Sequence, residues 1–296
     1  MNRREFTCAL ASTALPLSAH QAAGPPVPKK AKITSSVMLW TLKGTFEQKV
    51  EIAAKAGLQS LELVTEHVGW SDADIAARRK FVASYGLAMD TILGQPDWGK
   101  RPVSMVDPAH RAGFLKDVES ALVWAKKLEI PQVILMSGNE IAGRTRDAQY
   151  ASMLEGSKRA ADLAAKAGIR LIVEPLNAKV DHKGYYLATC AEGLKLVKEV
   201  DNPHFRLLFD LYHEQVQVGD PTKLAVEAMP FVSVYHVADA PGRNDPGTGQ
   251  MNYSEIYKAI AKAGYSGIIC MEYVPKAAPV PSLIAALDQM RTGVAG

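Results

Sequence analysis

The stretch LLFDLYHEQVQVGDPTKLAVEAMPFVSVYHVADAPGRNDPGTG, residues 207–249, contains two short apolar runs that each lead to residue types able to bind metal ions. The first run, 207–209, is followed by Asp210 and His213. The second run, 231–237, includes His236 and is followed by Asp239. Short apolar runs bounded by polar residues are typical of buried strands. Polar side chains that emerge where such strands end predict a functional site.

Two further carboxylates occur in the same setting. Glu174 follows the apolar run 171–173, and Glu272 follows 268–271. Asp210 lies 36 residues after Glu174, His236 lies 26 residues after Asp210, and Glu272 lies 36 residues after His236. Each interval fits one strand and one helix. If the strands are consecutive and parallel in a closed barrel, all four side chains meet at one rim, because parallel strands end on the same face.

Three carboxylates at that distance would repel one another, so they require a cation or a shared proton. Oxygen-rich ligation with a single imidazole and no thiolate favours Mn²⁺, Mg²⁺ or Co²⁺ over structural zinc. The alternative for any one of these carboxylates is a helix cap or a salt bridge. Four such residues at successive strand ends favour the metal site.

The rest of the chain alternates apolar runs with longer helical segments, which predicts an α/β fold, a single (β/α)₈ TIM barrel over residues 33–296. Eight strands are expected, at 33–40, 61–64, 87–93, 133–136, 171–173, 207–209, 231–237 and 268–271. Helices are expected at 45–56, 72–85, 108–128, 148–167, 191–200, 221–228, 254–263 and 281–291.

Helix-capping residues support this division. Asp107 and Asp220 each precede a proline, and Ser71 with Asp74 resembles a capping box. Four glycines that each precede a predicted strand suit the left-handed position after a helix: Gly57, Gly86, Gly168 and Gly264. The same helix ending used four times indicates a repeated βα unit.

Loops after the strands are expected to form the pocket. Candidate residues there are Trp40, Glu66, His67, Gln95 and Trp98, together with the segments 137–140 and 177–183. Packing at the rim or exposure to solvent is the alternative for each of them.

The N-terminus has the features of a twin-arginine export signal, predicted over residues 1–24. Arg3 and Arg4 precede an apolar run of small residues at 8–19, which is too short to span a bilayer. A proline-rich linker is expected at 25–32. These features predict a periplasmic protein without a stable membrane anchor. A disordered tail with chance arginines is the alternative.

The net charge is only +3 for 296 residues, which gives no electrostatic support for binding nucleic acid.

Four motifs resemble the xylose isomerase-like barrels, and hydroxypyruvate isomerases most of all. They are VEPLN at 173–177, FDLYH at 209–213, VADAPGR at 237–243 running into PGTG at 246–249, and MEY at 271–273. The resemblance implies that Glu174, Asp210, His236 and Glu272 hold one divalent ion, Mn²⁺ or Mg²⁺. It also implies acid/base roles for Glu174 and Glu272, and substrate contacts for His213 and Arg243. Members of this family are often homo-oligomers.

The implied reaction converts hydroxypyruvate to tartronate semialdehyde through an enediolate. One departure bears on the substrate, because hydroxypyruvate isomerases often have glutamine at the position of His236, whereas ketose 3-epimerases have histidine. Either way, the expected partner is a small hydroxy-keto acid or a sugar.

Other functions stay open at this point. A ketose 3-epimerase or another sugar isomerase would use the same groups, and Gly242, Gly247 and Gly249 could hold a phosphorylated sugar. DNA repair of the endonuclease IV kind needs additional histidines, and the chain has only seven. A non-catalytic sugar-binding barrel is the remaining alternative.

Overall fold

The computed structural model describes residues 32–97, 100–101 and 103–295. The predicted export signal, all of the predicted linker except Lys32, and the candidate pocket residue Trp98 lie outside this part of the chain. Within it, no helix is both long enough and apolar enough to cross a bilayer.

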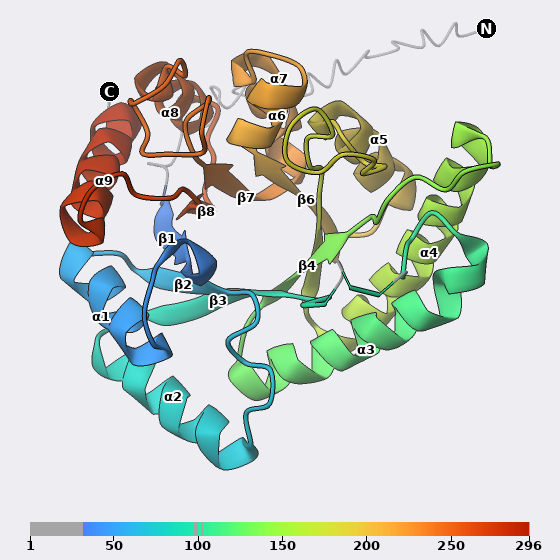
Figure 1. The fold of residues 1–296 in the computed structure, drawn as a ribbon, viewed down its shortest axis with the longest axis horizontal. Helices are drawn as coiled ribbons and strands as arrows, with labels where there is room; N and C mark the ends of the chain where they lie inside the picture. Colours follow the sequence, from blue (N-terminus) through green and yellow to red (C-terminus); the bar gives the residue numbers. More distant parts are fainter. Residues whose placement is uncertain (1–31, 98–99, 102, 296) are drawn as a thin grey trace, which may run out of the picture.

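Eight parallel strands form a closed barrel in sequence order, and the first strand pairs with the last (Figure 1). They are β1 Thr34–Met38, β2 Ser60–Leu63, β3 Ala88–Leu93, β4 Gln132–Met136, β5 Arg170–Glu174, β6 Phe205–Asp210, β7 Val232–Val237 and β8 Ile268–Met271. The predicted (β/α)₈ barrel and its eight strands are therefore confirmed. The prediction for the first strand was too long, because the chain leaves β1 at Met38 and turns into the 3₁₀ helix η1, Leu39–Thr41.

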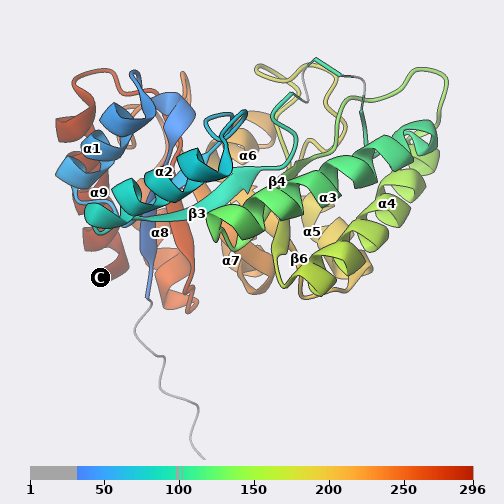
Figure 2. The same ribbon diagram turned by 90° about the horizontal axis from the view of Figure 1, so that it is seen from below.

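Helices surround the strands on the outside (Figures 1 and 2). They are α1 Phe46–Ala56, α2 Asp72–Ser84, α3 Arg111–Leu128, α4 Arg146–Ala167, α5 Cys190–Val200, α6 Leu211–Gln217, α7 Thr222–Ala228, α8 Tyr253–Lys262 and α9 Pro279–Ala295, with 3₁₀ helices η2 Pro108–His110 and η3 Met229–Phe231. Contacts of α9 with both α8 and α1 close the helical layer as β1 and β8 close the sheet.

The predicted capping interactions are present. The Ser71 side chain accepts a hydrogen bond from the Asp74 backbone, and Asp74 completes the capping box. Asp107 caps the start of η2. All four predicted glycines have φ between 69° and 90°, the left-handed region in which glycine is favoured.

The helices differ from the prediction at two places. The predicted helix 108–128 is divided, because η2 precedes α3. The helix α6 was not predicted, since the residues after Asp210 were interpreted only as site residues. Asp210 starts this helix itself, because its Oδ1 accepts hydrogen bonds from the backbone N–H groups of Tyr212 at 2.7 Å and His213 at 3.0 Å.

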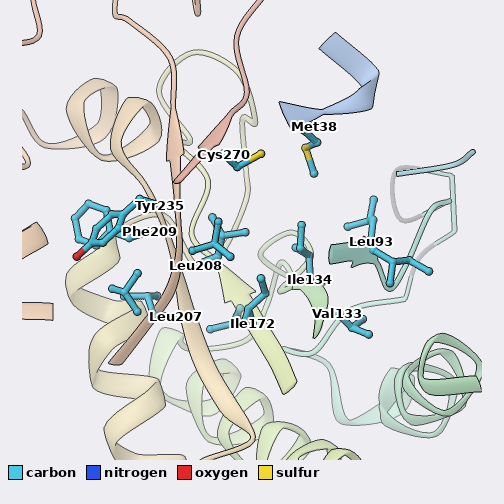
Figure 3. Close-up of a cluster of buried hydrophobic side chains, with 14 of the residues drawn as sticks. Met38, Leu93, Val133, Ile134, Ile172, Leu207, Leu208, Phe209, Tyr235 and Cys270 are labelled. Atoms are coloured by element: carbon cyan, nitrogen blue, oxygen red, sulfur yellow. The ribbon is translucent and has the colours of Figure 1, made fainter. Parts of the chain in front are cut away.

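Side chains alternate between the inside of the barrel and the layer under the helices. Figure 3 shows Ile134, Ile172 and Leu208 between the strands, where they fill the middle of the barrel. Phe209 and Tyr235, paired on β6 and β7, contact each other, and the Tyr235 hydroxyl donates to a backbone carbonyl of α7. This alternation directs Asp210 and His236, the next pair in the same register, into the barrel opening.

Candidate active site

The ends of the last four strands bring together Glu174, Asp210, His236 and Glu272. All four side chains are buried, and one ligand atom from each lies within 4.8 Å of the others. Glu174 ends β5, Asp210 ends β6, His236 is next to last in β7, and Glu272 directly follows β8. The sequence-based expectation that these residues converge at one rim is therefore confirmed.

The two carboxylate oxygens of Asp210 make different contacts at this rim. While its Oδ1 caps α6, its Oδ2 faces the site, 3.5 Å from His213 Nε2 and 3.6 Å from Arg243 Nη2. Burial, with a smaller contribution from the charge of Glu272, raises the pKa of the Asp210 carboxyl to about 7. The same side chain thus caps a helix and faces the other site residues.

His236 lies between carboxylates on both sides. Its Nδ1 is 2.7 Å from Glu272 Oε2 and 3.5 Å from Glu174 Oε1, and its Nε2 is 2.9 Å from Glu62 Oε2. Burial lowers the pKa of His236, but the charges of Glu62 and Glu272 outweigh this effect and hold the pKa well above its usual value. In this state both ring nitrogens carry a hydrogen.

Glu272 is the most strongly held of the carboxylates. Its Oε1 accepts from Trp40 Nε1 at 2.8 Å and pairs with Arg243 Nη2 at 2.7 Å, while its Oε2 contacts His236. Burial raises the pKa of Glu272, but Arg243 and His236 outweigh it and hold the carboxyl well below its usual range. Both oxygens of Glu272 are thus already engaged.

Glu174 differs, because its Oε1 is buried and makes no hydrogen bond to any residue that the structure describes. Burial is the main cause that raises the pKa of Glu174, although His236 and Arg243 partly oppose it. A carboxylate with a free oxygen and a raised pKa is suited to accept a proton from a bound molecule.

Arg243 places a partly buried guanidinium beside these groups. Its backbone has φ 55°, a conformation uncommon for a residue other than glycine, and its cation lies 5.2 Å from the Trp40 ring centroid and 5.4 Å from that of Tyr212. Nε of Arg243 is buried and makes no hydrogen bond to the described residues. A planar cation held in this way can bind a carboxylate of a ligand.

His213 is a neutral hydrogen-bond donor at the site. Its Nδ1 accepts from the Asn177 side chain at 2.6 Å and from the Asn177 backbone N–H at 3.3 Å, so the ring hydrogen is assigned to Nε2. Burial, followed by the charge of Arg243, holds the pKa of His213 well below its usual value. The Nε2–H group has no hydrogen-bond partner among the described residues.

The site lies in a cavity of about 250 Å³. The second half of the chain supplies its charged and imidazole groups, namely Glu174, His182, His213, Arg243 and Glu272. The first half supplies mainly apolar side chains, and with Leu176 they form the apolar lining: Met38, Trp40, Val64, Leu93, Met136 and Leu176. The cavity therefore offers polar contacts chiefly from β5–β8 and apolar contact from β1–β4.

The donor set fits a divalent cation. Three carboxylates and one imidazole nitrogen lie around a common centre, and a buried oxygen of Glu174 makes no hydrogen bond to the described residues. Oxygen ligands with one imidazole suit Mn²⁺ or Mg²⁺, and a cation would relieve the repulsion between the carboxylates. Glu174, Asp210, Glu272 and Nδ1 of His236 are the groups that could hold it.

Other expectations for the rim had mixed outcomes. Trp40 and His182 line the cavity, and Asn177 orients His213, whereas Glu66 forms an ion pair with Lys49. Asp239 accepts from the backbone N–H groups of Gly247 and Met251, so it holds its own loop. Because Gly247 uses its N–H in this way, that group is not free to bind a phosphate.

The sequence analysis missed Glu62, which lies one residue before the end of β2. Its side chain contacts His236 through the interior of the barrel. The hydrogen bond from Trp40 to Glu272 was missed as well. A carboxylate inside the predicted strand 61–64 was the only signal that could have indicated Glu62.

Comparisons with known proteins agree with the fold and the motifs. The sequence profile described as "xylose isomerase-like TIM barrel" matches residues 50–291. A hydroxypyruvate isomerase of Escherichia coli (strain K12) is 28% identical over 235 residues, which cover 78% of this chain and 88% of that protein. A 2-oxo-tetronate isomerase of Pectobacterium atrosepticum is 31% identical over 161 residues, which cover 54% of this chain and 61% of that protein.

Among solved structures, an AP endonuclease, family 2, from Brucella melitensis superposes with a TM-score of 0.77 at 26% identity. The match covers 87% of this chain and 98% of that one.

Proposed function

The chain belongs to the xylose isomerase-like TIM barrel family, and on that basis we propose that it is an isomerase of small hydroxy-keto acids that uses one divalent cation. Hydroxypyruvate, converted to tartronate semialdehyde, is the proposed substrate. The observation that carries the proposal is the meeting, in one cavity, of three groups: a carboxylate with an oxygen that makes no hydrogen bond to the described residues, a fixed carboxylate and a partly buried guanidinium.

The proposed cation is Mn²⁺ or Mg²⁺, held by Glu174, Asp210, Glu272 and Nδ1 of His236. When bound, it supplies Lewis acidity that stabilises the negative charge of an enediolate. The protein groups do the remaining work, which is to bind the substrate, orient it and move its protons.

Glu174 is the proposed base. Isomerisation of hydroxypyruvate removes a proton from the hydroxymethyl carbon and returns a proton to the neighbouring ketone carbon. Glu174 has a free oxygen and a raised pKa, whereas Glu272 is held ionised by Arg243, Trp40 and His236. We therefore assign the first proton removal to Glu174 and a later acid/base role to Glu272.

Arg243 and His213 are the proposed substrate contacts. The substrate carboxylate would pair with the guanidinium of Arg243, and a substrate oxygen would accept from Nε2–H of His213. The contacts of Arg243 with the Trp40 and Tyr212 rings limit the movement of its guanidinium group, so this group is oriented before the substrate binds.

A ketose 3-epimerase is the second candidate, for which the same carboxylates would remove and return a proton at one carbon. The size of the cavity favours it, because about 250 Å³ leaves room beyond a three-carbon acid. His236, which matches the histidine of such epimerases, favours it as well. A four-carbon hydroxy-keto acid, such as the substrate named for the Pectobacterium relative, is intermediate in size.

The experiment loads the protein with Mn²⁺ and follows incorporation of solvent deuterium by NMR into hydroxypyruvate and a panel of ketoses. Exchange into hydroxypyruvate, with tartronate semialdehyde formed, supports the isomerase. Exchange only into longer ketoses moves the assignment to the epimerase. Absence of exchange with every compound, despite bound Mn²⁺, contradicts both.

We further propose export to the periplasm through the paired arginines Arg3 and Arg4. Replacing both by lysine should retain the protein in the cytoplasmic fraction. Unchanged periplasmic recovery would contradict a twin-arginine route.

A further inference from the structure

One carboxylate that the proposed reaction does not use lies directly behind His236. Glu62 is on β2, three strands from β7 around the ring, and its side chain reaches His236 through the interior of the barrel. Both side chains are 0% exposed. Glu62 is therefore not accessible to a substrate in this structure.

The His236 ring has a different neighbour at each nitrogen. Nδ1 faces the carboxylates at the cavity, 2.7 Å from Glu272 and 3.5 Å from Glu174. Nε2 faces Glu62 at 2.9 Å. Because a carboxylate oxygen can only accept, Nε2 must carry a hydrogen toward Glu62. With the hydrogen on Nε2, the neutral ring has its lone pair on Nδ1, which faces the cavity. Nδ1 is then able to bind a cation.

The burial of Glu62 is costly, and few of the described polar groups compensate for it: His236 pairs with it, and the thiol of Cys270 lies beside it. Its one ion pair within this part of the chain is with His236, and its second oxygen, Oε1, is buried without a hydrogen-bond partner. A buried carboxylate with so few partners lowers stability relative to an apolar side chain of similar size. Packing therefore does not account for a glutamate at this place.

We propose that Glu62 is a positioning residue for the divalent cation, which acts by fixing the tautomer and the ring orientation of His236. A carboxylate that accepts from the second nitrogen of a ligating histidine raises the affinity of the site, typically by 10- to 100-fold. The inference rests on the proposed function, because it concerns the cation of that same site.

The test is a double-mutant cycle on Mn²⁺ affinity, measured by electron paramagnetic resonance on the full chain without substrate. The variants are Glu62→Leu, His236→Gln and the two combined. Glu62→Leu alone should weaken Mn²⁺ binding by about 10- to 100-fold. With glutamine at 236 the ring is absent, so Glu62→Leu should then weaken binding by less than about threefold.

Two further variants separate this role from a general effect on the barrel. Glu62→Gln keeps an oxygen that can accept from Nε2, so it should restore part of the affinity that leucine removes. Asp90→Asn changes another buried carboxylate inside the barrel, which bonds to Ser36 and Thr91 and to none of the proposed ligands, and it should leave Mn²⁺ affinity unchanged.

An equal loss of Mn²⁺ affinity from Glu62→Leu with histidine and with glutamine at 236, or no loss in either case, would overturn the role of Glu62. Mn²⁺ binding by the unmodified protein would still support the proposed function. Failure of the unmodified protein to bind Mn²⁺ would overturn the metal-dependent function itself and this inference with it.

Discussion

Glu174→Gln is the change that tests the proposed chemistry most directly. Glutamine has the same shape, but it cannot accept the substrate proton. Among the described residues, the one ion pair of Glu174 is the long contact to His236 at 3.5 Å, so the substitution breaks no short ion pair there. A positioned base contributes about 10²- to 10⁴-fold to the rate, which corresponds to roughly 3–5 kcal/mol of activation free energy.

Deuterium exchange into hydroxypyruvate, measured by NMR at saturating Mn²⁺, reports this step without the need to detect product. Bound Mn²⁺ is measured on the same sample, so that a lost base is distinguished from a lost ligand. Glu140→Gln is the matched control, because Glu140 is an exposed carboxylate that pairs with Arg146 away from the cavity.

Glu272→Gln provides the contrast. Each oxygen of Glu272 already faces a donor, so the NH₂ group of glutamine must point at Arg243 and Trp40 or at His236. We expect this variant to lose Mn²⁺ affinity as well as exchange. Should Glu174→Gln retain bound Mn²⁺ and exchange within about tenfold of the unmodified protein, below the range for a positioned base, the assignment of Glu174 is refuted.

Three further predictions follow from the charges in the barrel. Arg243→Lys should raise KM for hydroxypyruvate with a smaller effect on neutral ketoses, because lysine keeps the charge but not the planar two-pronged donor; equal KM changes for both in steady-state assays would argue against a carboxylate contact. Mn²⁺ affinity should fall as pH falls from 8 to 5, since the carboxyl of Asp210, with a pKa of about 7, then holds a proton that the cation must displace; calorimetry in buffers of different ionisation enthalpy should detect proton release near pH 6, and its absence would count against Asp210 as a ligand. Burial raises the pKa of Asp90 from 3.8 to about 7 in the folded state, so the protein should lose stability as pH rises from about 4 to 7. Asp90→Asn should then be more stable than the unmodified protein at pH 8 by up to roughly 4 kcal/mol. Denaturant unfolding that shows no such gain would contradict an ionised Asp90 as the cause.

The regular alternation of apolar runs and helices made the barrel predictable from the sequence. Strands in such a barrel are buried on both faces, so each appears as a short continuous apolar run, and the glycines at 57, 86, 168 and 264 marked the helix ends. Position at strand ends also predicted the convergence of the four site residues, because parallel strands share one rim.

What the sequence did not predict depends on contacts across the barrel. Glu62 touches His236 over 174 positions of sequence, and Trp40 reaches Glu272 over 232. No local spacing indicates such pairs. The helix α6 was missed for a different reason, because Asp210 caps that helix with one oxygen while the other faces the site. A sequence pattern assigns Asp210 either to a helix cap or to a site. In the structure one carboxylate does both, because each of its oxygens has a different contact.

The pairing of β1 with β8 has a consequence for how the protein comes into being. Synthesis proceeds from the N-terminus, so the ribosome has made the first seven strands before the carboxylate after β8 exists. Trp40, in the first βα unit, donates a hydrogen bond to that carboxylate, so this bond cannot form until the last strand has been made. The nascent chain therefore cannot assemble the complete set of acidic groups. Under the proposed function, cation binding and proton transfer would therefore require the finished chain, because the carboxylate after β8 completes the set of acidic groups.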